Sequence, residues 1–466
     1  MSSASAPTKS GGGGLLLAVI YVTCLFFIWA FVTNLVDPLV KSMKVIYTLT
    51  DAEAQLNQFA FFIAYGIMSI PSAAYLAKNG YAKSIILGLT GIVAGCLIAW
   101  STTFSHNFIT VLLGLFVAAS GITLLQVAAN PLIASMGDAK GSHFRLNLSQ
   151  AFNSMGAFLG GMFGSKFLLN GPLFDKDVVI TEAMKATGLG FVTNVYLIIA
   201  AILAVFTLAV FMVRNTVSSN SPKMAEHIES PLSAFKSKWA NLGSLGIFLY
   251  VGAEVCVISG MIFFLEQPQI LNIKSQYAGF IGPVFMLFAM FGRFIGSWLM
   301  TFVKATTMLA IVALGAIILC VVVIATYHMD ATPLNGTFPI PTFAAAPEPG
   351  IYNAPLTTGF LPGFAALLIG LFNSIMFPTI FTLTLERSSA PASATSGLMC
   401  MAICGGGFIS VAYGFAVDQF LAHFPVGARS LAFCVPLVCY LYVLWFAQAA
   451  KKAPTHAIEE GVSAGH

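Results

Sequence analysis

Long apolar runs alternate with short polar segments along almost the whole chain. A helix needs about 20 predominantly apolar residues to cross the hydrocarbon core of a bilayer. By that measure the pattern predicts twelve membrane-spanning helices. They cover approximately residues 15–40, 54–77, 82–101, 107–135, 146–169, 190–213, 242–265, 276–300, 305–327, 360–385, 392–418 and 427–449.

Two longer gaps divide this pattern. Residues 214–241 carry four basic side chains and separate the first six spans from the last six. Residues 328–359 are rich in Pro and Ala, which predicts an extended, irregular loop. The predicted parts are an N-terminal tail (1–14), an N-terminal bundle (15–213), a linker (214–241), a C-terminal bundle that includes the loop (242–449), and a C-terminal tail (450–466).

The composition is typical of a membrane protein with several spans. The 466 residues are 58% hydrophobic and only 8% charged, and the mean hydropathy of +0.89 excludes a soluble globular domain. The net charge of +4 comes from scattered Lys and Arg, so nucleic acid is not expected as a partner. Basic residues are in excess in the loops that lie inside if both termini are cytoplasmic. The linker is therefore predicted to be cytoplasmic, and the loop 328–359 to face outward.

The two halves resemble each other weakly. The segment Leu112–Phe116 (LLGLF) in the fourth span has a counterpart in Leu368–Phe372 (LIGLF) in the tenth. Two similar six-helix halves with a site at their interface are the layout of an alternating-access transporter. The predicted fold class is an all-α membrane protein with twelve transmembrane helices in two six-helix bundles.

The fifth span carries an unusual polar stripe. Asn147, Gln150 and Asn153 recur at three-residue intervals, so they share one face of a helix. Amides in hydrocarbon are costly without partners, so this face either bonds neighbouring helices or lines a wet cavity. A cavity lined by amides suits a neutral polyol. Three glycines that follow at four-residue spacing, and so allow two helix backbones to approach closely, are Gly156, Gly160 and Gly164.

Acidic side chains are few within the spans, and two of them are candidates for chemistry. Glu254 is in the middle of the seventh span, where a carboxylate costs about 2.5–3.5 kcal/mol and is expected to be paired, protonated or facing a cavity. Asp37 either ends the first span at the outer interface, with Pro38 as the helix breaker, or belongs to a binding strip. That strip would join Asp37 to Asn34 and Trp29, whose ring can cover the C–H face of a sugar.

Other polar positions interrupt the spans. Pro131 leaves the carbonyl near Val127 without its helical N–H partner, so this carbonyl is open either to a helix neighbour or to a ligand. Gln126 lies beside it. Gln58 in the second span and Asn373 in the tenth are similar candidates, with ordinary hydrogen bonds between helices as the alternative.

Arg293 lies in the inner third of the eighth span. We predict that it forms a gating or structural ion pair with an acid at a helix end, rather than a substrate contact. The sequence contains no nucleotide loop, nucleophile elbow or metal-ligand spacing, so an enzyme is not indicated.

Several segments together resemble the fucose–proton symporter family of the major facilitator superfamily, and within it the branch of glucose/galactose or N-acetylglucosamine transporters. As a set they are specific to the family, though not to one sugar. The matching segments are Phe27–Ala30 through Asp37, Ala128–Pro131, His143–Ser154, Tyr250–Ala253, Gly292–Phe294 and Pro378–Phe381.

The resemblance implies the major facilitator fold and a central sugar cavity lined by Asp37, Gln150, Asn153 and Trp29. It also reveals a difference, because fucose permease has an acid implicated in proton coupling where this chain has Gln126. An amide does not take up a proton in the working range. The segment that contains Glu254 instead resembles the glucose/galactose branch of the family, some members of which use sodium. The implied substrate is therefore glucose, galactose or N-acetylglucosamine, with either proton or sodium as the coupling ion.

The resulting hypothesis is import of a neutral hexose by cation symport, as the two bundles rock about a central site. Asp37 and Glu254 are the cation-coupling candidates, and sodium would bind near Asp37. The substrate-binding candidates are Trp29, Asn34, Gln58, Gln126, Gln150, Asn153, Glu254 and Asn373. No cofactor or fixed metal is expected.

The expected partners are the sugar and the lipid bilayer. The expected form is a monomer in a bacterial inner membrane. The alternative function is a multidrug or metabolite antiporter on the same fold, which the amide stripe disfavours. A non-transporting membrane sensor is a third class, disfavoured by the short linker.

Overall fold

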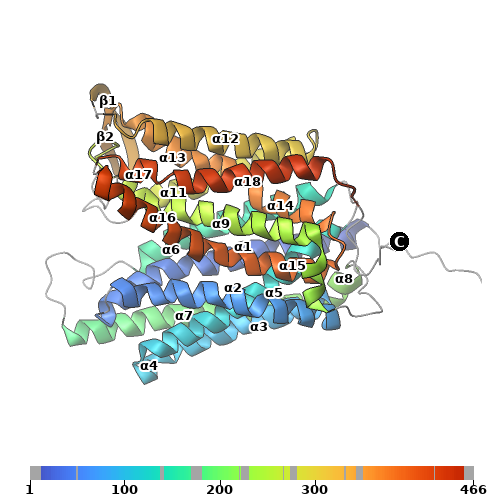
Figure 1. Ribbon diagram of the computed structural model, residues 1–466. Coiled ribbons are helices and arrows are strands. Elements are labelled where there is room, and N and C mark those ends of the chain that lie inside the picture. The colour runs from blue at the N-terminus through green and yellow to red at the C-terminus, as the bar shows by residue number, and fades with distance from the viewer. Residues whose placement is uncertain are drawn as a thin grey trace, which may run out of the picture.

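The structure is a computed structural model in which two groups of helices, one from each half of the chain, lie side by side (Figure 1). The residues that it describes are 12–48, 51–136, 141–168, 181–219, 221, 230–265, 267–272, 281–329, 332–342, 350–424 and 426–455.

The first half contributes six long helices and the short helix α4. They are α1 (Gly12–Ile46), α2 (Asp51–Asn79), α3 (Tyr81–Trp100), α4 (Thr102–Ser105), α5 (Phe108–Ser135), α6 (Ser142–Leu168) and α7 (Glu182–Met212). The linker contains α8 (Arg214–Ser219) and the 3₁₀ helix η3 (Pro231–Lys236).

The second half contributes six further spans, three of them built from consecutive helices. The single helices are α9 (Lys238–Leu265), α11 (Ile281–Leu299) and α12 (Ala305–Ala325). The composite spans are α13 (Phe360–Asn373) with α14 (Met376–Leu385); α15 (Ala392–Met401) with η4 (Ala402–Cys404) and α16 (Gly405–His423); and α17 (Ala428–Leu431) with α18 (Cys434–Lys451).

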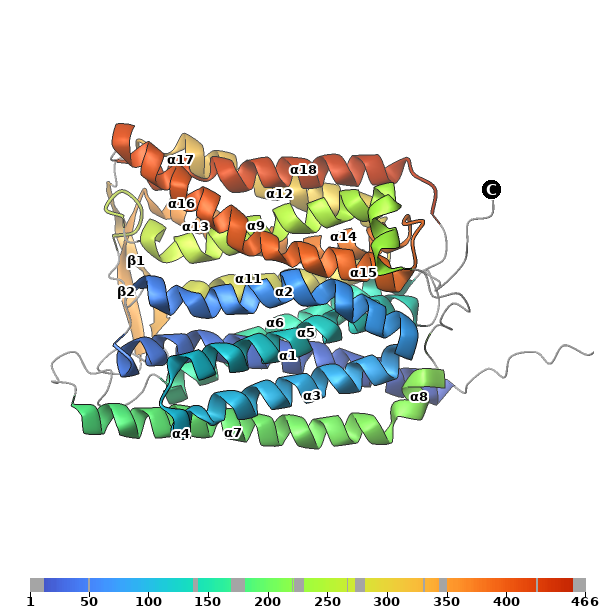
Figure 2. The ribbon, with the colours of Figure 1, turned by 60° about the horizontal axis from the view of Figure 1, so that its bottom comes forward.

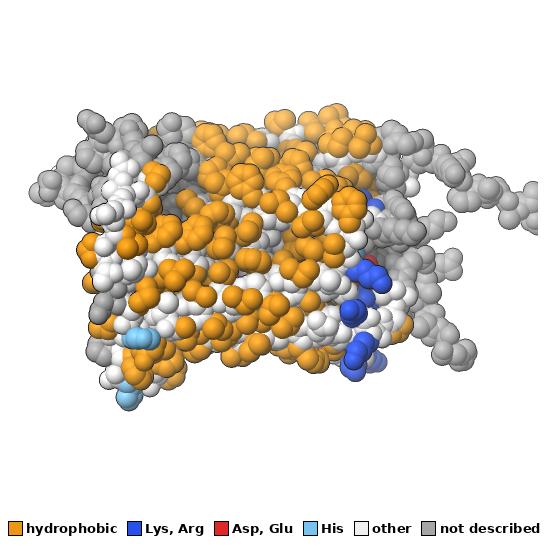
Figure 3. All heavy atoms as spheres, turned by 90° about the horizontal axis from the view of Figure 1, so that it is seen from above, with side chains coloured by type: hydrophobic (Ala, Val, Ile, Leu, Met, Phe, Trp, Pro, Cys, Tyr) orange, Lys and Arg blue, Asp and Glu red, His pale blue; other side chains and the backbone are white. Residues whose placement is uncertain are grey.

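These elements confirm the twelve predicted spans. Ten helical segments among the described residues are long and apolar enough to cross a membrane. The other two spans are α6, which carries the polar stripe, and α11, which is apolar over Val284–Leu299. A broad band of apolar side chains covers the middle of the molecule, and Lys and Arg gather at one end (Figure 3). Side chains such as Val205, Phe302 and Val411 are exposed in the structure, as expected for a surface that faces lipid.

We call the two ends of the molecule the linker end, which carries α8 and the start of α15, and the hairpin end, which carries the strands β1 (Pro333–Thr342) and β2 (Gly350–Thr357) (Figure 2). The hairpin corrects the prediction of an irregular loop over 328–359, because β1 and β2 pair in antiparallel register. Its prolines misled the prediction. Each strand of a two-stranded ribbon has an unpaired edge, so a proline whose missing N–H would point outward is tolerated there.

The first helix also differs from one of its two predicted forms. Pro38 does not end it, because α1 continues to Ile46. A proline removes one helical hydrogen bond but keeps a helical φ, and a helix packed among neighbours accommodates that loss. Asp37 is therefore within α1, although its side chain lies outside the described residues.

The glycine spacing in α6 produces the predicted close approach of two helices. A Cβ atom added to Gly156 would overlap the carbonyl oxygen of Phe27, and one added to Gly160 would overlap that of Phe31. Both carbonyls belong to α1, so the two helices lie nearly backbone to backbone. The surroundings of Gly164, the third glycine of the pattern, are outside the described part of the structure.

We expect Gly156→Ala to lower the thermal stability of the detergent-solubilised protein. The added methyl group has no space beside α1, and overpacking of this kind typically costs about 1–3 kcal/mol. The matched control is Gly190→Ala in α7, where a Cβ would meet no atom within 4 Å, so its melting temperature should be unchanged or higher. Equal melting temperatures for wild type and Gly156→Ala would contradict the close packing.

The two bundles meet along two seams near the linker end. In one seam α15 packs on α2 and α5, and in the other α11 packs on α6. Toward the hairpin end the first seam loosens, since α16 has much less contact with α2 than α15 does. The polar residues of the spans are concentrated beside these seams.

Candidate functional site

The N-terminal bundle holds its polar side chains in pairs between helices. Gln126 of α5 donates from Nε2 to the Tyr65 hydroxyl of α2 at 2.7 Å. Gln150 of α6 is buried and donates from Nε2 to Oδ1 of Asn130 at 3.4 Å. Asn153 is half-buried and donates from Nδ2 to the carbonyl oxygen of Phe26 at 3.1 Å. Each of these three amides is thus oriented by a different neighbouring helix.

The polar stripe of α6 serves two purposes. Asn147, at its start, is fully buried and contacts the sulfur of Met300 at 3.3 Å, so it joins helices. Gln150 and Asn153 lie farther along, where the described surface of α6 becomes partly accessible. The alternative that the amides bond neighbouring helices therefore holds for Asn147, while Asn153 keeps an accessible edge.

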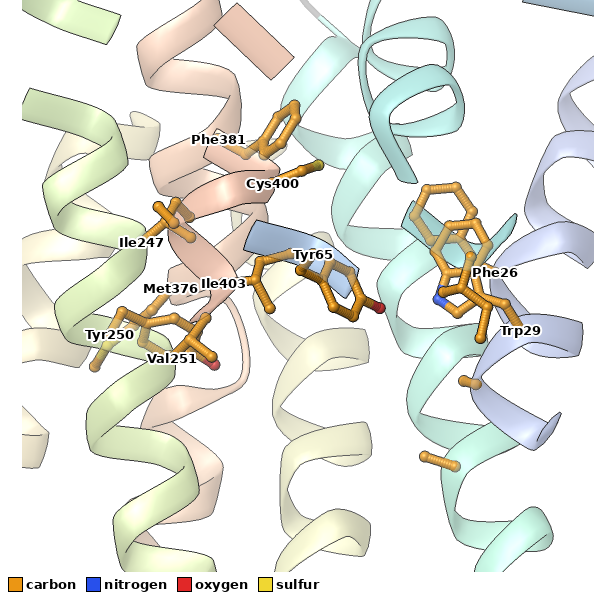
Figure 4. Close-up of a cluster of buried hydrophobic side chains, with 14 of the residues drawn as sticks. Phe26, Trp29, Tyr65, Ile247, Tyr250, Val251, Met376, Phe381, Cys400 and Ile403 are labelled. Carbon is orange, nitrogen blue, oxygen red and sulfur yellow. The ribbon is translucent and has the colours of Figure 1, made fainter. Parts of the chain in front are cut away.

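The ring of Trp29 is almost completely buried and packs against Phe26, with 4.3 Å between the ring centroids. The Asn34 side chain is partly exposed and donates to the carbonyl of Ala30 within its own helix at 2.9 Å. In Figure 4, Tyr65 lies between the Phe26–Trp29 pair of the first bundle and Ile403 and Val251 of the second. Trp29 and Tyr65 thus face the region where the bundles meet.

The carbonyl freed by Pro131 has a partner in the other bundle. The Ser396 hydroxyl of α15 donates to the Val127 carbonyl oxygen at 2.8 Å, and Ser396 is fully buried. In this conformation the carbonyl is therefore satisfied by a helix neighbour, which was one of the two alternatives. Gly397, the next residue of α15, lies close to Ala73 and the Ser69 carbonyl of α2. A small residue is thus required where α15 crosses α2.

Arg293 of α11 joins the second seam. Its guanidinium donates from Nε to the Ser374 carbonyl at 2.8 Å and from Nη1 to the Gln150 carbonyl at 3.1 Å. Nη1 also bonds the Ser154 hydroxyl. The predicted ion pair is not formed among the described side chains. Arg293 instead bonds neutral oxygens of both bundles while 93% of its surface is buried.

The second bundle adds a tyrosine and an acid next to this arginine. The Tyr250 hydroxyl donates to the Asn373 carbonyl at 3.0 Å. The Glu254 carboxyl and the Arg293 guanidinium both lie beside that hydroxyl. Tyr250 is one helical turn before Glu254 and therefore shares its face of α9. The structure thus brings Glu254 and Arg293, and through the Gln150 carbonyl the α6 stripe, into one network.

The side chains of two candidates, Asp37 and Gln58, lie outside the described residues, although their backbones belong to α1 and α2.

Asn373 is fully buried at the break between α13 and α14, beside Tyr440. Its side chain faces the interior of the second bundle rather than the seam, so the structure does not bring it to the amides of α6.

A separate polar cluster joins the bundles at the linker end. Glu386, directly after α14, accepts from Nε2 of His143 at 2.9 Å and from Arg387 at 3.1 Å. Ser142 lies 3.5 Å from the same carboxylate. Burial opposes ionisation of Glu386, but the hydrogen bond and charge of His143, with the charge of Arg387, outweigh it and hold the pKa of the carboxyl below its ordinary value. The contact therefore favours an ionised Glu386 when this end is closed.

We expect Glu386→Gln to destabilise the protein at neutral pH by about 1–3 kcal/mol, because it removes the charge of a partly buried hydrogen-bonded group. A lowered pKa means that the contribution is complete above the ordinary carboxyl pKa of about 4.3 and is lost only as the pH falls through the lower value in the folded protein. Melting curves of wild type and variant should therefore stay apart from pH 8 to pH 5.

The matched control for that substitution is Glu182→Gln, which removes an exposed pair with Lys185 in the first turn of α7. Exposed pairs of this kind contribute little, so the control should melt like wild type. A Glu386→Gln variant that also melts like wild type at pH 7 would contradict the role of this cluster.

A small cavity also lies within the first bundle. It is lined by apolar side chains such as Val32, Cys96 and Tyr196 between α1, α3, α5 and α7. These walls offer almost no hydrogen-bonding groups, so the cavity does not suit a polyol. The network at the seams remains the candidate site.

Sequence patterns missed some members of this network. Ser396 was not among the candidate residues, while Asn130 and Tyr250 belonged to the segments Ala128–Pro131 and Tyr250–Ala253 without a role of their own. Tyr250 could have been assigned one from its position one turn before Glu254, and Asn130 from its place beside Pro131. Ser396 carries no such signal, because its role depends on a carbonyl in the opposite half of the chain.

Known proteins are similar to this chain over most of its length. The family model of the Major Facilitator Superfamily matches residues 22–411. A glucose/galactose transporter of Brucella abortus is 33% identical over 94% of each chain. The L-fucose-proton symporter of Escherichia coli is 30% identical over 93% of this chain and 92% of its own.

Solved structures are similar as well. The crystal structure of the transporter FucP in the outward conformation has a TM-score of 0.76 and 26% sequence identity, and covers 94% of this chain and 99% of its own. A structure of the proton:xylose symporter XylE has a TM-score of 0.65 at 12% identity, covers 97% of this chain and 98% of its own, and supports the fold alone.

Proposed function

Because this chain belongs to the Major Facilitator Superfamily, we propose that it is a secondary transporter that imports a neutral hexose by cation symport. The observation that carries the proposal is the set of uncharged amides of α5 and α6, of which Gln150 accepts a hydrogen bond from Arg293 of the other bundle through its carbonyl oxygen. Amides recognise hydroxyls by both donating and accepting hydrogen bonds. These amides lie near the interface of the two bundles, which is where an alternating-access transporter binds its substrate.

The substrate class follows from the relatives. Proteins named glucose/galactose transporters, from Brucella abortus and Helicobacter pylori, align with 94% of this chain. We therefore propose glucose or galactose as the substrate, with N-acetylglucosamine as a further hexose to be tested. The binding residues would be Gln126, Gln150 and Asn153 from the first bundle and Glu254 from the second, with the ring of Trp29 beside them.

The coupling ion is proposed to be a proton, with sodium as the alternative. Two relatives are named proton symporters of L-fucose. Asp37 would carry the ion, since Gln126 cannot be protonated in the working range. Glu254 is the second candidate, because it lies beside Tyr250 and Arg293 at the seam.

The state described here would be one that opens to the outside. The bundles pack closely at the linker end, and basic side chains gather at that end (Figure 3). The excess of Lys and Arg supports a cytoplasmic location for it, with both termini inside a bacterial inner membrane. The hairpin would then face outward. A monomer is the proposed form, since each chain carries both bundles.

An antiporter for drugs or metabolites is the weaker alternative. A pocket for lipophilic cations would need large aromatic walls, whereas the described side chains beside the seams include several amides and hydroxyls. The relatives named for proton coupling are symporters.

The experiment that tests the proposal is uptake into proteoliposomes under proton and sodium gradients imposed separately. We expect labelled glucose or galactose to accumulate when the outside is acidic and to exchange without any gradient. Accumulation driven only by a sodium gradient would identify sodium, and not the proton, as the coupling ion. A lack of exchange for every hexose, together with efflux of dyes, would favour the antiporter.

A further inference from the structure

Tyr65 and Gln126 form a hydrogen-bonded pair next to the seam between the bundles. The Nε2 atom of Gln126 donates to the Tyr65 hydroxyl at 2.7 Å. Tyr65 is only 3% exposed and its ring packs against Phe61, with 5.5 Å between centroids. The tyrosine is therefore held rigidly by α2, while the Gln126 side chain is partly exposed.

The pair retains unused hydrogen-bonding capacity. A tyrosine hydroxyl has one hydrogen to donate, and a glutamine carboxamide has an accepting oxygen besides its NH₂ group. The bond from Gln126 uses one lone pair of the hydroxyl. Among the described residues, the bond between the two is the one side-chain hydrogen bond that either makes, so the Tyr65 hydroxyl hydrogen and Oε1 of Gln126 are not used in it. Together they offer one donor and one acceptor side by side.

The pair lies where the two bundles meet. Helix α2 packs on α15 and η4 of the second bundle. In Figure 4 the hydroxyl of Tyr65 points away from Ile403 and toward the side of Phe26 and Trp29. Gln126 is one helical turn before Asn130, the partner of Gln150. The unused donor and acceptor are thus next to the amides of the candidate site.

We propose that Tyr65 is a positioning and specificity residue for the sugar, an inference that rests on the proposed function. It holds the Gln126 carboxamide through Nε2 and leaves Oε1 unbonded among the described residues, and it offers its own O–H next to that oxygen. One sugar hydroxyl can accept from Tyr65 and donate to Gln126 at the same time. The pair therefore recognises a single hydroxyl of the hexose and discriminates against the sugar that lacks it.

The test compares hexose with its monodeoxy analogues in counterflow exchange. In wild type, one of the analogues should bind about tenfold more weakly than the parent sugar, since it leaves the pair without its partner. In Tyr65→Phe the parent sugar should bind about tenfold more weakly as well, with a maximal rate within about twofold of wild type. The discrimination at that one hydroxyl should then disappear, while that at the other positions stays.

Two further variants keep the test sharp. Gln126→Ala should lose discrimination at the same hydroxyl, and the double variant should lose no more than either single one. The control is Tyr196→Phe, which removes a buried hydroxyl of α7 on the far side of the first bundle and should change neither affinity nor discrimination.

Three results would overturn the inference. Weaker binding of the parent sugar and of all analogues by the same factor in Tyr65→Phe would assign Tyr65 to packing. Unchanged affinity would remove it from the site. Absence of exchange in wild type itself would refute the proposed function, and this outcome is distinct because it is independent of Tyr65.

Discussion

Replacing Asp37 by Asn should abolish uphill uptake of the sugar while exchange of labelled for unlabelled sugar continues. One charge that moves down a membrane potential of 100 mV supplies about 2.3 kcal/mol. At about 1.4 kcal/mol for each factor of ten, this corresponds to accumulation of roughly 50-fold. An amide has the shape of the acid but neither binds a proton nor attracts sodium, so the variant should equilibrate the sugar without concentrating it.

The measurement is the ratio of internal to external sugar at steady state, together with the rate of counterflow. Counterflow establishes that the Asp37→Asn protein is folded and can bind the sugar. The control is Asp418→Asn in α16, an exposed acid of the second bundle, which should accumulate sugar like wild type. Full accumulation by Asp37→Asn would exclude Asp37 from coupling and leave Glu254 as the candidate.

Removal of the Arg293 side chain should reduce exchange by 100-fold or more. Arg293→Ala leaves the Ser374 and Gln150 carbonyls and the Ser154 hydroxyl without their donor. It also leaves Glu254 without the nearby positive charge. Breaking a buried charged network on one side typically costs about 3–5 kcal/mol, and 3 kcal/mol is more than a factor of 100 in an equilibrium constant.

Arg293→Lys separates the effect of charge from that of geometry. An ammonium group keeps the charge, but it lacks the planar fork that reaches α6 and Ser374 together. We expect Arg293→Lys to fold and to exchange sugar at least tenfold more slowly than wild type. The control is Arg214→Lys at the linker, where the guanidinium stacks on Phe211 near the surface, and exchange should be normal. Normal exchange by Arg293→Ala would show that the seam does not depend on this residue.

Much of the fold was predictable because the bilayer imposes its own length on the sequence. Each apolar run of about 20 residues had to be a span, and the spacing of Gly156 and Gly160 identified the face of α6 that packs closely on another helix. Pro38 was harder to interpret, since a proline within a helix and a proline at its end have the same local sequence. The hairpin at Pro333–Thr357 was missed because its prolines are typical of loops as well as of ribbon edges.

The site was predictable in its residue types but not in its partners. Amides and acids within spans stand out because hydrocarbon makes them costly. Their partners are often backbone carbonyls, such as that of Ser374 for Arg293, and every residue has a carbonyl. A proline marks such a carbonyl, since Pro378 has no N–H to offer the Ser374 carbonyl four residues earlier. The sequence does not mark which donor will reach it. An acid was therefore expected for Arg293, whereas the structure supplies neutral oxygens.

The bond between Ser396 and the Val127 carbonyl has a consequence for the other half of a transport cycle. The two groups belong to different bundles, so they must separate when the linker end opens. The carbonyl cannot return to a helical bond, because Pro131 has no N–H to offer. We expect water to hydrate it in that state, so that the inner vestibule wets to the depth of this proline once in every turnover.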